Sequence, residues 1–281
     1  MQVETKIYQK ESNLKIGKLI KESAKDFFGS HFLAKQLATR DIKSQYRQSY
    51  LGVVWAFITP ITSALVWIFL NATGTVKLSD TGVPYPVFVF SGTLIWSIIS
   101  EAINSPTKNT NAARGIMTKI NFPKEALILS GIYKLLFNSI IKIAILIVFI
   151  FVYGIGFHWS LFLFPFAIVA AILFGTTVGL FVTPISLIYN DISKITSMGL
   201  SLLMYITPVV YAIPKDGIMK TIMEINPFTA LILTSRDFAI GHVPEYLGYF
   251  FWIFGISAAL FFIGLLFYRI SIPVIVERLN A

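Results

Sequence analysis

The chain has 281 residues, of which 56% are hydrophobic and 13% are charged, and 23 Lys and Arg against 14 Asp and Glu give a net charge of +9. This composition lies well outside ordinary globular usage and indicates a membrane protein. The absence of cysteine excludes disulfides, thiol catalysis and Cys-ligated metal sites. Membrane lipids with anionic headgroups, or an acidic partner, account for the positive charge, so no nucleic acid is implied.

Residues 1–50 form a predicted cytosolic arm without the apolar core of a signal peptide, so we expect the first membrane span to act as an uncleaved signal. Four apolar residues recur every four positions and form one stripe: Ala34, Ala38, Ile42 and Tyr46. A basic row on the opposite side contains Gln36, Arg40, Lys43 and Arg47. The pattern predicts an amphipathic helix of about 25 residues that starts near Asp26 and lies at the membrane surface. Such a helix either is solvated beside the membrane or braces a cytosolic partner against the bilayer.

Residues 51–268 form a predicted all-α transmembrane domain of six helices, followed by a cytosolic tail over 269–281. Charge-free runs extend over 48–76, 81–100, 143–190, 195–214 and 246–268. Each reaches the roughly 20 residues that a helix needs to cross a bilayer, and the longest run divides into two spans at the glycine-containing turn 153–160. Most Lys and Arg residues fall on one side of these spans, which predicts a multi-pass protein with both termini in the cytoplasm.

The connection 107–125 between the second and third spans is more structured than a plain loop. Ser105-Pro106 predicts the end of the second span, and Thr110 or Asn111 is expected to cap a short helix over 114–120. The turn 121–123 then starts the third span with a proline near its first position. This segment either plugs into a cytosolic partner or is a helical linker. The candidate residues for coupling to a cytosolic partner are Arg114, Lys119, Asn121, Phe122, Pro123 and Lys124, with Arg40 and Arg47 of the arm.

Polar residues within the spans are few. Lys134, Asn138 and Lys142 follow one another at four-residue steps and give the third span one polar face. Lys142 lies deep in the span, where an unpaired charge is costly, so we expect it to face protein or water. A place in the translocation path and a structural hydrogen bond to a neighbouring helix are equal alternatives for Lys142.

Aromatic residues make up 15% of the chain, and most of them are expected to face lipid or the membrane interface. Trp55, Tyr205 and Tyr211 are candidates for the translocation path because their rings combine an apolar stacking face with a polar tip. The three histidines lie far apart in the sequence and predict no metal site. Carboxylates are almost absent from the spans, with Glu101 as the main exception, which argues against glycosyl-transfer catalysis.

The segment 215–245 between the fifth and sixth spans is too apolar for a free loop. Asn226 as N-cap, Pro227 at the first helical position and Gly241 past the end predict a helix of about 14 residues, half the length needed to cross a membrane. Two short helices in this segment predict a re-entrant hairpin that forms an outer gate, and a surface-lying amphipathic helix is the alternative. The candidate gate residues are Asn226, Pro227, Phe228, Arg236 and Asp237.

Several motifs follow one another in a fixed order: Arg40-Asp41-Ile42-Lys43, Gln45-Tyr46-Arg47, Leu51-Gly52, Trp55-Ala56, Pro60, Asn121-Phe122-Pro123-Lys124-Glu125, Asn226-Pro227-Phe228, Arg236-Asp237 and Glu277-Arg278. Together they resemble the membrane subunit of ABC transporters that export lipid-linked O-antigens, capsular polysaccharides and teichoic acids. The resemblance extends from about residue 30 to the end of the chain. It departs from the family at Asn190-Asp191, where many members have Arg-Asp.

The resemblance implies a homodimer of six-helix subunits in the bacterial cytoplasmic membrane, joined by two copies of a separately encoded ATPase. It also implies an N-terminal interface helix, a coupling helix between the second and third spans, and re-entrant helices that form the outer gate. The chain has no Gly-x-x-x-x-Gly-Lys-Ser/Thr motif, so we expect no cofactor in this chain and assign ATP and Mg to the partner.

The favoured function is therefore the transport subunit, and not an enzyme, of an ATP-driven exporter of a lipid-linked polysaccharide, O-antigen above all. A proton-driven glycolipid flippase or secondary transporter, in which Lys142 titrates, is the first alternative. A membrane-embedded enzyme of glycolipid synthesis is the second. No motif identifies the glycan.

Overall fold

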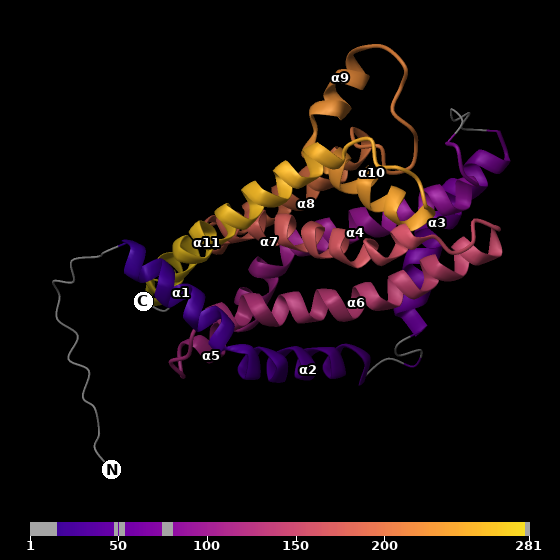
Figure 1. Ribbon diagram of the computed structural model, residues 1–281. Helices are drawn as coiled ribbons and strands as arrows, with labels where there is room; N and C mark the ends of the chain where they lie inside the picture. Colours follow the sequence, from indigo (N-terminus) through magenta and orange to yellow (C-terminus); the bar gives the residue numbers. More distant parts are fainter. Residues whose placement is uncertain (1–15, 48–49, 51–53, 75–80, 279–281) are drawn as a thin grey trace.

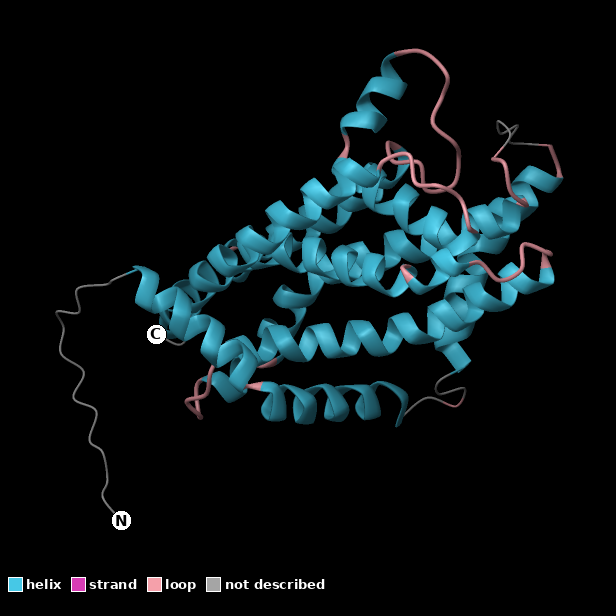
Figure 2. Ribbon diagram, in the orientation of Figure 1, coloured by secondary structure: helices cyan, strands magenta, loops and turns pink. Residues whose placement is uncertain are grey.

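The computed structural model describes residues 16–47, 50, 54–74 and 81–278, and within these residues all regular structure is helical (Figure 2). The helices are α1 (Ile16–Gly29), α2 (His31–Arg47), α3 (Trp55–Ala72), α4 (Tyr85–Ala112), α5 (Arg114–Met117), α6 (Glu125–Val152), η2 (Trp159–Phe162), α7 (Phe164–Ile188), α8 (Asn190–Tyr205), α9 (Ile218–Ile225), α10 (Pro227–Ile240) and α11 (Leu247–Arg278). This confirms the all-α class. Some predicted features lie outside the described part of the chain: Leu51-Gly52 and the side chains of Tyr46, Ala56, Glu277 and Arg278.

Four helical segments are long and apolar enough to cross a membrane: Tyr85–Ala112, Glu125–Val152, Trp159–Ile188 and Leu247–Ile275. They correspond to the second, third, fourth and sixth predicted spans. The first and fifth predicted spans contain α3 and α8, which have 18 and 16 residues. These lengths fall short of the roughly 20 residues that a spanning helix needs. Six spans therefore stay a prediction, whereas four are supported by length and composition.

Helix α4 lies at the centre of the bundle and packs against α6, α7, α3 and α10 (Figure 1). Its closest neighbour is α7, because two glycines on α7 remove the side chains that would separate the two helices. A Cβ atom added to Gly175 would lie 2.6 Å from the Cβ of Ala102, and one added to Gly179 would collide with the carbonyl oxygen of Ile103. The spacing of small residues in the sequence therefore marks a real contact between helices.

Replacing Gly179 with alanine is expected to lower the free energy of unfolding by about 1–3 kcal/mol, because the new methyl group overpacks the α4–α7 contact. The measurement is thermal unfolding of the purified protein in detergent. The matched control is Gly255→Ala in α11, where no atom lies within 4 Å of the added Cβ. That substitution should be neutral or stabilising, since alanine favours helix more than glycine does. Equal stability of the two variants would contradict this account of the α4–α7 contact.

The N-terminal arm consists of two helices, so the prediction of one helix starting near Asp26 is wrong. The break falls at Ser30, where the packing changes, since α1 packs mainly against α11 whereas α2 packs against α6. Phe27 of α1 contacts Phe261 of α11 edge to face, with ring centroids 5.4 Å apart. Ala34 and Ala38 of the predicted apolar stripe are buried against the protein, and Ile42 is half-buried. The basic row is exposed, as predicted, at Gln36, Arg40, Lys43 and Arg47.

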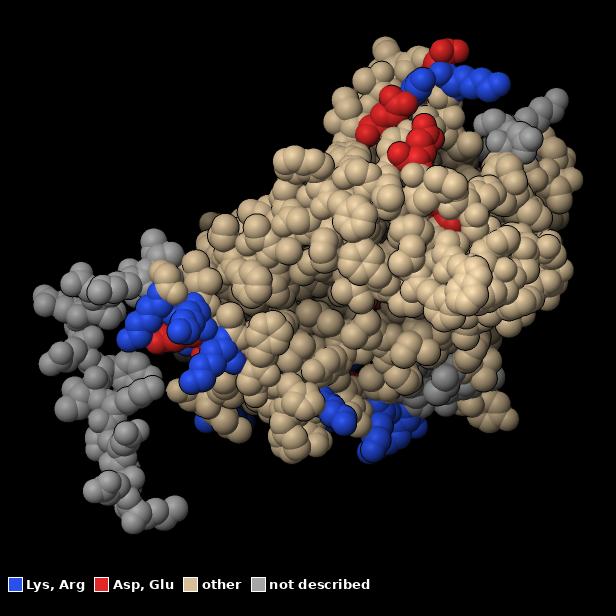
Figure 3. Space-filling view, viewed as in Figure 1, with Lys and Arg blue, Asp and Glu red and all other residues tan. Residues whose placement is uncertain are grey.

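Charged residues gather at two opposite sides of the molecule (Figure 3). Lys and Arg residues dominate the side over α1 and α2, which we call the basic end. The side that carries α9 has both acidic and basic residues and is called the α9 end. A broad surface without charged side chains lies between them, as expected for a protein whose middle faces lipid.

Candidate functional site

The connection from α4 to α6 differs from the prediction in its helix boundaries. Helix α4 continues through Pro106 to Ala112, so the expected end of this helix at Ser105-Pro106 is wrong. Thr110 lies in the last turns of α4 and forms a buried hydrogen bond of 2.6 Å with the hydroxyl of Tyr268. It therefore does not cap the next helix. Burial against α6 and α7 outweighs the tendency of proline to end a helix, as is common in membrane proteins.

Helix α5 is shorter than predicted, covers only Arg114–Met117, and is anchored at the basic end of the bundle. Met117 is buried in a cluster with Phe27 and Ala34 of the arm. The Nη2 group of Arg114 donates a 3.1 Å hydrogen bond to the carbonyl of Leu187, at the end of α7. Helix α5 is thus fixed to the last turn of α7 and to the N-terminal arm.

The turn after α5 has an exposed tip and a fixed base. Lys119, Ile120 and Asn121 are exposed, and we call 119–121 the exposed tip. At the base, Lys124 lies 4.7 Å from the ring centroid of Phe122 and donates a 3.0 Å hydrogen bond to the carbonyl of the same residue. Burial lowers the pKa of Lys124, partly offset by the neighbouring carboxylate of Glu125.

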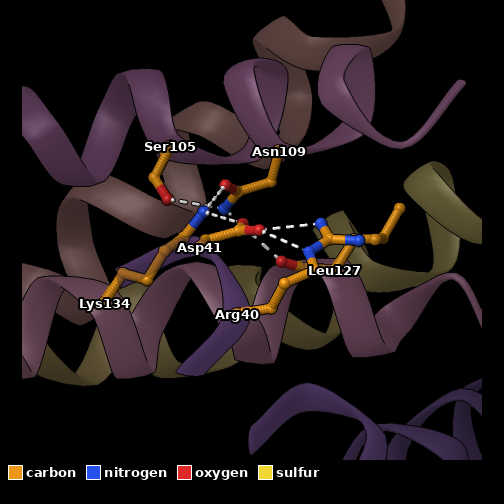
Figure 4. Close-up of polar contacts among 6 residues, drawn as sticks. All are labelled: Arg40, Asp41, Ser105, Asn109, Leu127 and Lys134. Carbon is orange, nitrogen blue, oxygen red and sulfur yellow. Dashed lines mark hydrogen bonds and ion pairs between the residues drawn. The ribbon is translucent and has the colours of Figure 1, made fainter. Parts of the chain in front are cut away.

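A cluster of polar side chains ties α2 to α4 and α6 (Figure 4). Lys134 of α6 lies 2.9 Å from the carboxylate of Asp41 and also donates to the side-chain carbonyl of Asn109 on α4. Arg40 binds the same carboxylate at 2.7 Å. Asn109 in turn donates to the Ser105 hydroxyl at 3.1 Å. We call these residues the Asp41 cluster: Arg40, Asp41, Ser105, Asn109 and Lys134.

The electrostatics of the Asp41 cluster favour an ionised carboxylate. Burial raises the pKa of Asp41, but the hydrogen bonds and charges of Lys134 and Arg40 outweigh this effect and hold the pKa below its ordinary value. Gly131 makes room for the cluster, because an added Cβ would collide with the side chains of Asn109 and Ser105. The predicted coupling residue Arg40 is thus part of a contact that joins the arm to both helices flanking α5.

A second ionic contact fastens the other arm helix. Arg269 of α11 lies 2.6 Å from Asp26 of α1 and 2.9 Å from Glu125, the first residue of α6. Ser23 of α1 donates to the same Glu125 oxygen at 3.0 Å. The sequence interpretation assigned no role to Asp26 or Arg269, whose partners are more than a hundred residues away. Helix α1 is therefore held at Glu125, the first residue of α6, and α2 is held at Lys134 in the first half of the same helix.

The helix of about 14 residues predicted after Asn226 is confirmed as α10, which has 14 residues. Asn226 accepts a 3.0 Å hydrogen bond from the backbone N–H of Phe228, and Gly241 ends the helix with φ of 85°. The ring of Phe228 lies 5.4 Å from Trp96 of α4 and 5.2 Å from Phe174 of α7. Helix α10 is mostly buried, whereas α9 projects from the bundle in Figure 1. The re-entrant hairpin itself stays a prediction.

Arg236, a predicted gate residue, is 2% exposed, and its side chain lies in the protein interior. Its guanidinium donates to the carbonyls of Pro208 and Val209 and to the hydroxyl of Ser91, and lies 3.6 Å from the ring centroid of Phe88. Asp237 follows it and is partly exposed. Arg236 therefore fastens α10 to α4 and to the segment after α8.

The four candidates for the translocation path lie on different elements. Trp55 begins α3, Tyr205 ends α8, and Tyr211 lies in the segment after α8, where its ring packs against the core. Lys142 of α6 is buried and lies 2.7 Å from Glu101 and 2.9 Å from the hydroxyl of Ser97, both on α4. Lys142 therefore faces protein, one of the two surroundings expected for it, and its place in the translocation path stays a prediction.

Comparison with known proteins gives a consistent family. The model of the ABC-2 type transporter family matches residues 33–238. The O-antigen export system permease protein RfbA of Myxococcus xanthus is 27% identical over 209 residues, which cover 73% of this chain and 79% of that protein. A protein of the same name from Klebsiella pneumoniae is 25% identical over 218 residues, covering 75% of this chain and 81% of the relative. Because the family match covers well over half of the sequence, the chain belongs to the ABC-2 type transporter family of membrane proteins.

Proposed function

We propose that the chain is the membrane subunit of an ATP-driven exporter that moves a lipid-linked polysaccharide, O-antigen above all, across the cytoplasmic membrane of a bacterium. The observation that carries the proposal is its similarity to O-antigen export permeases over 73% and 75% of its length. In this proposal the chain forms a homodimer. Two copies of a separate ATPase bind ATP and Mg and supply the energy.

The orientation follows from the distribution of charge. Positively charged residues favour the cytoplasmic side of a membrane, so the basic end faces the cytoplasm and both termini lie there. The α9 end then faces outward, with α9 and α10 as the outer gate. Helices α3 and α8 complete six spans.

The ATPase is proposed to bind the exposed tip 119–121 and the basic row of α2. Arg114 joins α5 to the end of α7, and the Asp41 cluster joins α2 to α4 and α6. Displacement of the tip by the ATPase therefore moves α4, α6 and α7 as packed bodies. No part of this movement needs a bound nucleotide in the chain itself.

Replacing Arg114 with alanine is expected to reduce export about tenfold while ATP hydrolysis continues, because a charge-assisted hydrogen bond between α5 and α7 is lost. The two rates are measured together, on the assembled transporter in sealed vesicles that contain the lipid-linked glycan. Lys18→Ala is the matched control, since Lys18 is an exposed cation of α1 whose ion-pair partner is Glu22 of the same helix.

Two outcomes would count against these proposals. Normal export by the Arg114 variant would show that the α5–α7 bond does not couple the two activities. Transport that follows a pH gradient and ignores ATP would favour the proton-driven alternative, for which the ionisable pair Lys142 and Glu101 is the relevant observation.

A further inference from the structure

Helix α4 carries a polar face along a helix that is otherwise mostly buried. Ser97, Glu101, Asn104 and Lys108 follow at steps of four, three and four residues and therefore share one side of the helix. All four are at least partly exposed in the single chain. The same helix is apolar and buried on the sides that contact α7 and α10.

Helix α8 extends this polar surface. The hydroxyl of Ser197 donates to the side-chain carbonyl of Asn104 at 3.4 Å. Lys194, Ser201 and Tyr205 lie on the same side of α8 as Ser197, by the same spacing argument, and all are exposed. We call the combined surface the α4–α8 polar face: Ser97, Glu101, Asn104, Lys108, Lys194, Ser197, Ser201 and Tyr205.

Glu101 lies near the middle of α4. It is about 24 Å from one end of the helix and about 16 Å from the other, at 1.5 Å per residue. Its side chain is 41% exposed, whereas that of its partner Lys142 is 11% exposed. The Lys142 ammonium binds the Oε1 oxygen at 2.7 Å, and among the described residues the Oε2 oxygen has no hydrogen-bond partner. A half-exposed carboxylate at this depth is costly against lipid, so this face requires water, protein or a polar ligand.

We propose that Glu101 is a sugar-binding residue of the translocation path, and that its free carboxylate oxygen accepts hydrogen bonds from the hydroxyls of the passing glycan. The chemistry of the surface supports a glycan rather than a lipid tail, since hydroxyls, an amide and a carboxylate belong to the same polar face as the exposed ring of Tyr205. Lys142 acts as a positioning residue behind the carboxylate and does not itself contact the glycan. The inference rests on the proposed function, because it takes a polysaccharide as the cargo.

The first test measures whether the α4–α8 polar face is accessible to water. The chain has no cysteine, so any thiol labelling of this chain comes from the single cysteine that is introduced. Asn104→Cys and Ser201→Cys, each in the assembled transporter in membrane vesicles, are treated with a charged, membrane-impermeant thiol reagent. The control is Ile140→Cys, which lies on the exposed apolar side of α6, two residues from Lys142. We expect the two polar-face cysteines to react at least tenfold faster than the control. Equal, slow reaction of all three would overturn the proposal, because lipid or a second protein would then cover the face.

The second test separates binding from structural pairing. Glu101→Gln is expected to reduce export about tenfold, because it removes a charged acceptor and leaves Lys142 without its counter-charge. The double variant Glu101→Gln with Lys142→Met removes the unpaired cation and should recover thermal stability, yet its export should stay low. Recovery of export in the double variant would show that the pair is only structural, and would overturn the proposal.

The two proposals fail in different ways. If the wild-type transporter moves no polysaccharide in an ATP-dependent manner, the proposed function is wrong. If it does, and Glu101→Gln exports at the wild-type rate, only the sugar-binding role of Glu101 is wrong. Lys18→Met, at an exposed cation of α1 that lies 4.0 Å from Glu22, controls for loss of a charge elsewhere in the chain.

Discussion

Replacing Arg236 with methionine is expected to lower the free energy of unfolding by about 2–5 kcal/mol, because two buried carbonyls lose their donor at once. The Nη2 group lies 2.7 Å from the carbonyl oxygen of Val209 and 3.1 Å from that of Pro208. Methionine fills much of the same volume but donates no hydrogen bond. The guanidinium contact with the ring of Phe88 is lost as well.

The measurement is the midpoint of thermal unfolding in detergent, followed by the helical circular dichroism signal. Lys220→Met is the matched control, because this cation lies at the surface of α9, 3.9 Å from Glu224, and should change stability by less than about 0.5 kcal/mol. Gly92→Ala tests the same contact from the other side, since the added Cβ would collide with the carbonyl of Val209 and with Arg236. If both Arg236→Met and Gly92→Ala unfold at the wild-type temperature, the guanidinium does not hold these elements together.

Local signals predicted α10 well because its ends are fixed by backbone chemistry. Asn226 supplies an N-cap acceptor, Pro227 has the backbone angle of a first helical residue, and Gly241 adopts the left-handed conformation that ends a helix. These three features lie within the helix or next to it. The sequence alone was therefore sufficient to give both boundaries.

Boundaries set by packing were not predictable in the same way. A proline often marks a helix end, but α4 continues past Pro106, where it is buried against α6 and α7 and Thr110 forms a hydrogen bond with Tyr268 of α11. At the break at Ser30 the packing changes, since α1 packs mainly against α11 and only to a lesser extent against α6, whereas α2 packs against α6. Neither neighbour is near in sequence, so a single helix was the simplest interpretation of the arm.

The candidate site shows the same difference between features set by the local sequence and features set by packing. That Lys142 needs a polar partner followed from its depth in an apolar helix. Its partner Glu101 is 41 residues away, and the contact between Asp41 and Lys134 joins residues 93 apart. The sequence therefore indicated that Lys142 could not be left unpaired in lipid, whereas the contacts of Lys142, Asp41 and Lys134 depended on how α2, α4 and α6 pack.

Replacing Asp41 with alanine is expected to reduce export at least tenfold while ATP hydrolysis continues. The carboxylate is the group that joins α2 to Lys134, and through Lys134 to Asn109 on α4 (Figure 4). Without it, α2 stays packed through its alanine stripe but loses its charged link to the two helices that flank α5. In the proposed transporter, a displacement that the ATPase imposes on α2 would then no longer be passed to α4 and α6. Export and hydrolysis are measured on the same vesicles.

The pH dependence of this contact has a definite sign. The pKa of Asp41 is lower in the folded protein than its ordinary value. Its stabilising contribution is therefore complete at neutral pH and is lost as the pH falls through the lowered pKa. The difference in stability between the wild type and Asp41→Ala should stay constant across the neutral range and shrink only in acid. A difference that instead grew in acid would show that the carboxylate is not held by Lys134 and Arg40.

A double-mutant cycle measures the interaction energy between Asp41 and Lys134 separately from the other contacts of each side chain. Asp41→Ala and Lys134→Met each leave the other side chain unpaired, so the double variant should be more stable than the sum of the two losses implies, by about 1–3 kcal/mol. Asp191→Ala is the matched control, because this carboxylate pairs with Lys194 at 3.4 Å on the exposed surface, where an ion pair contributes little. Additive losses in the cycle, with export unchanged in Asp41→Ala, would mean that α2 moves independently of α6. The tip 119–121 would then be the only route by which the ATPase acts on the bundle.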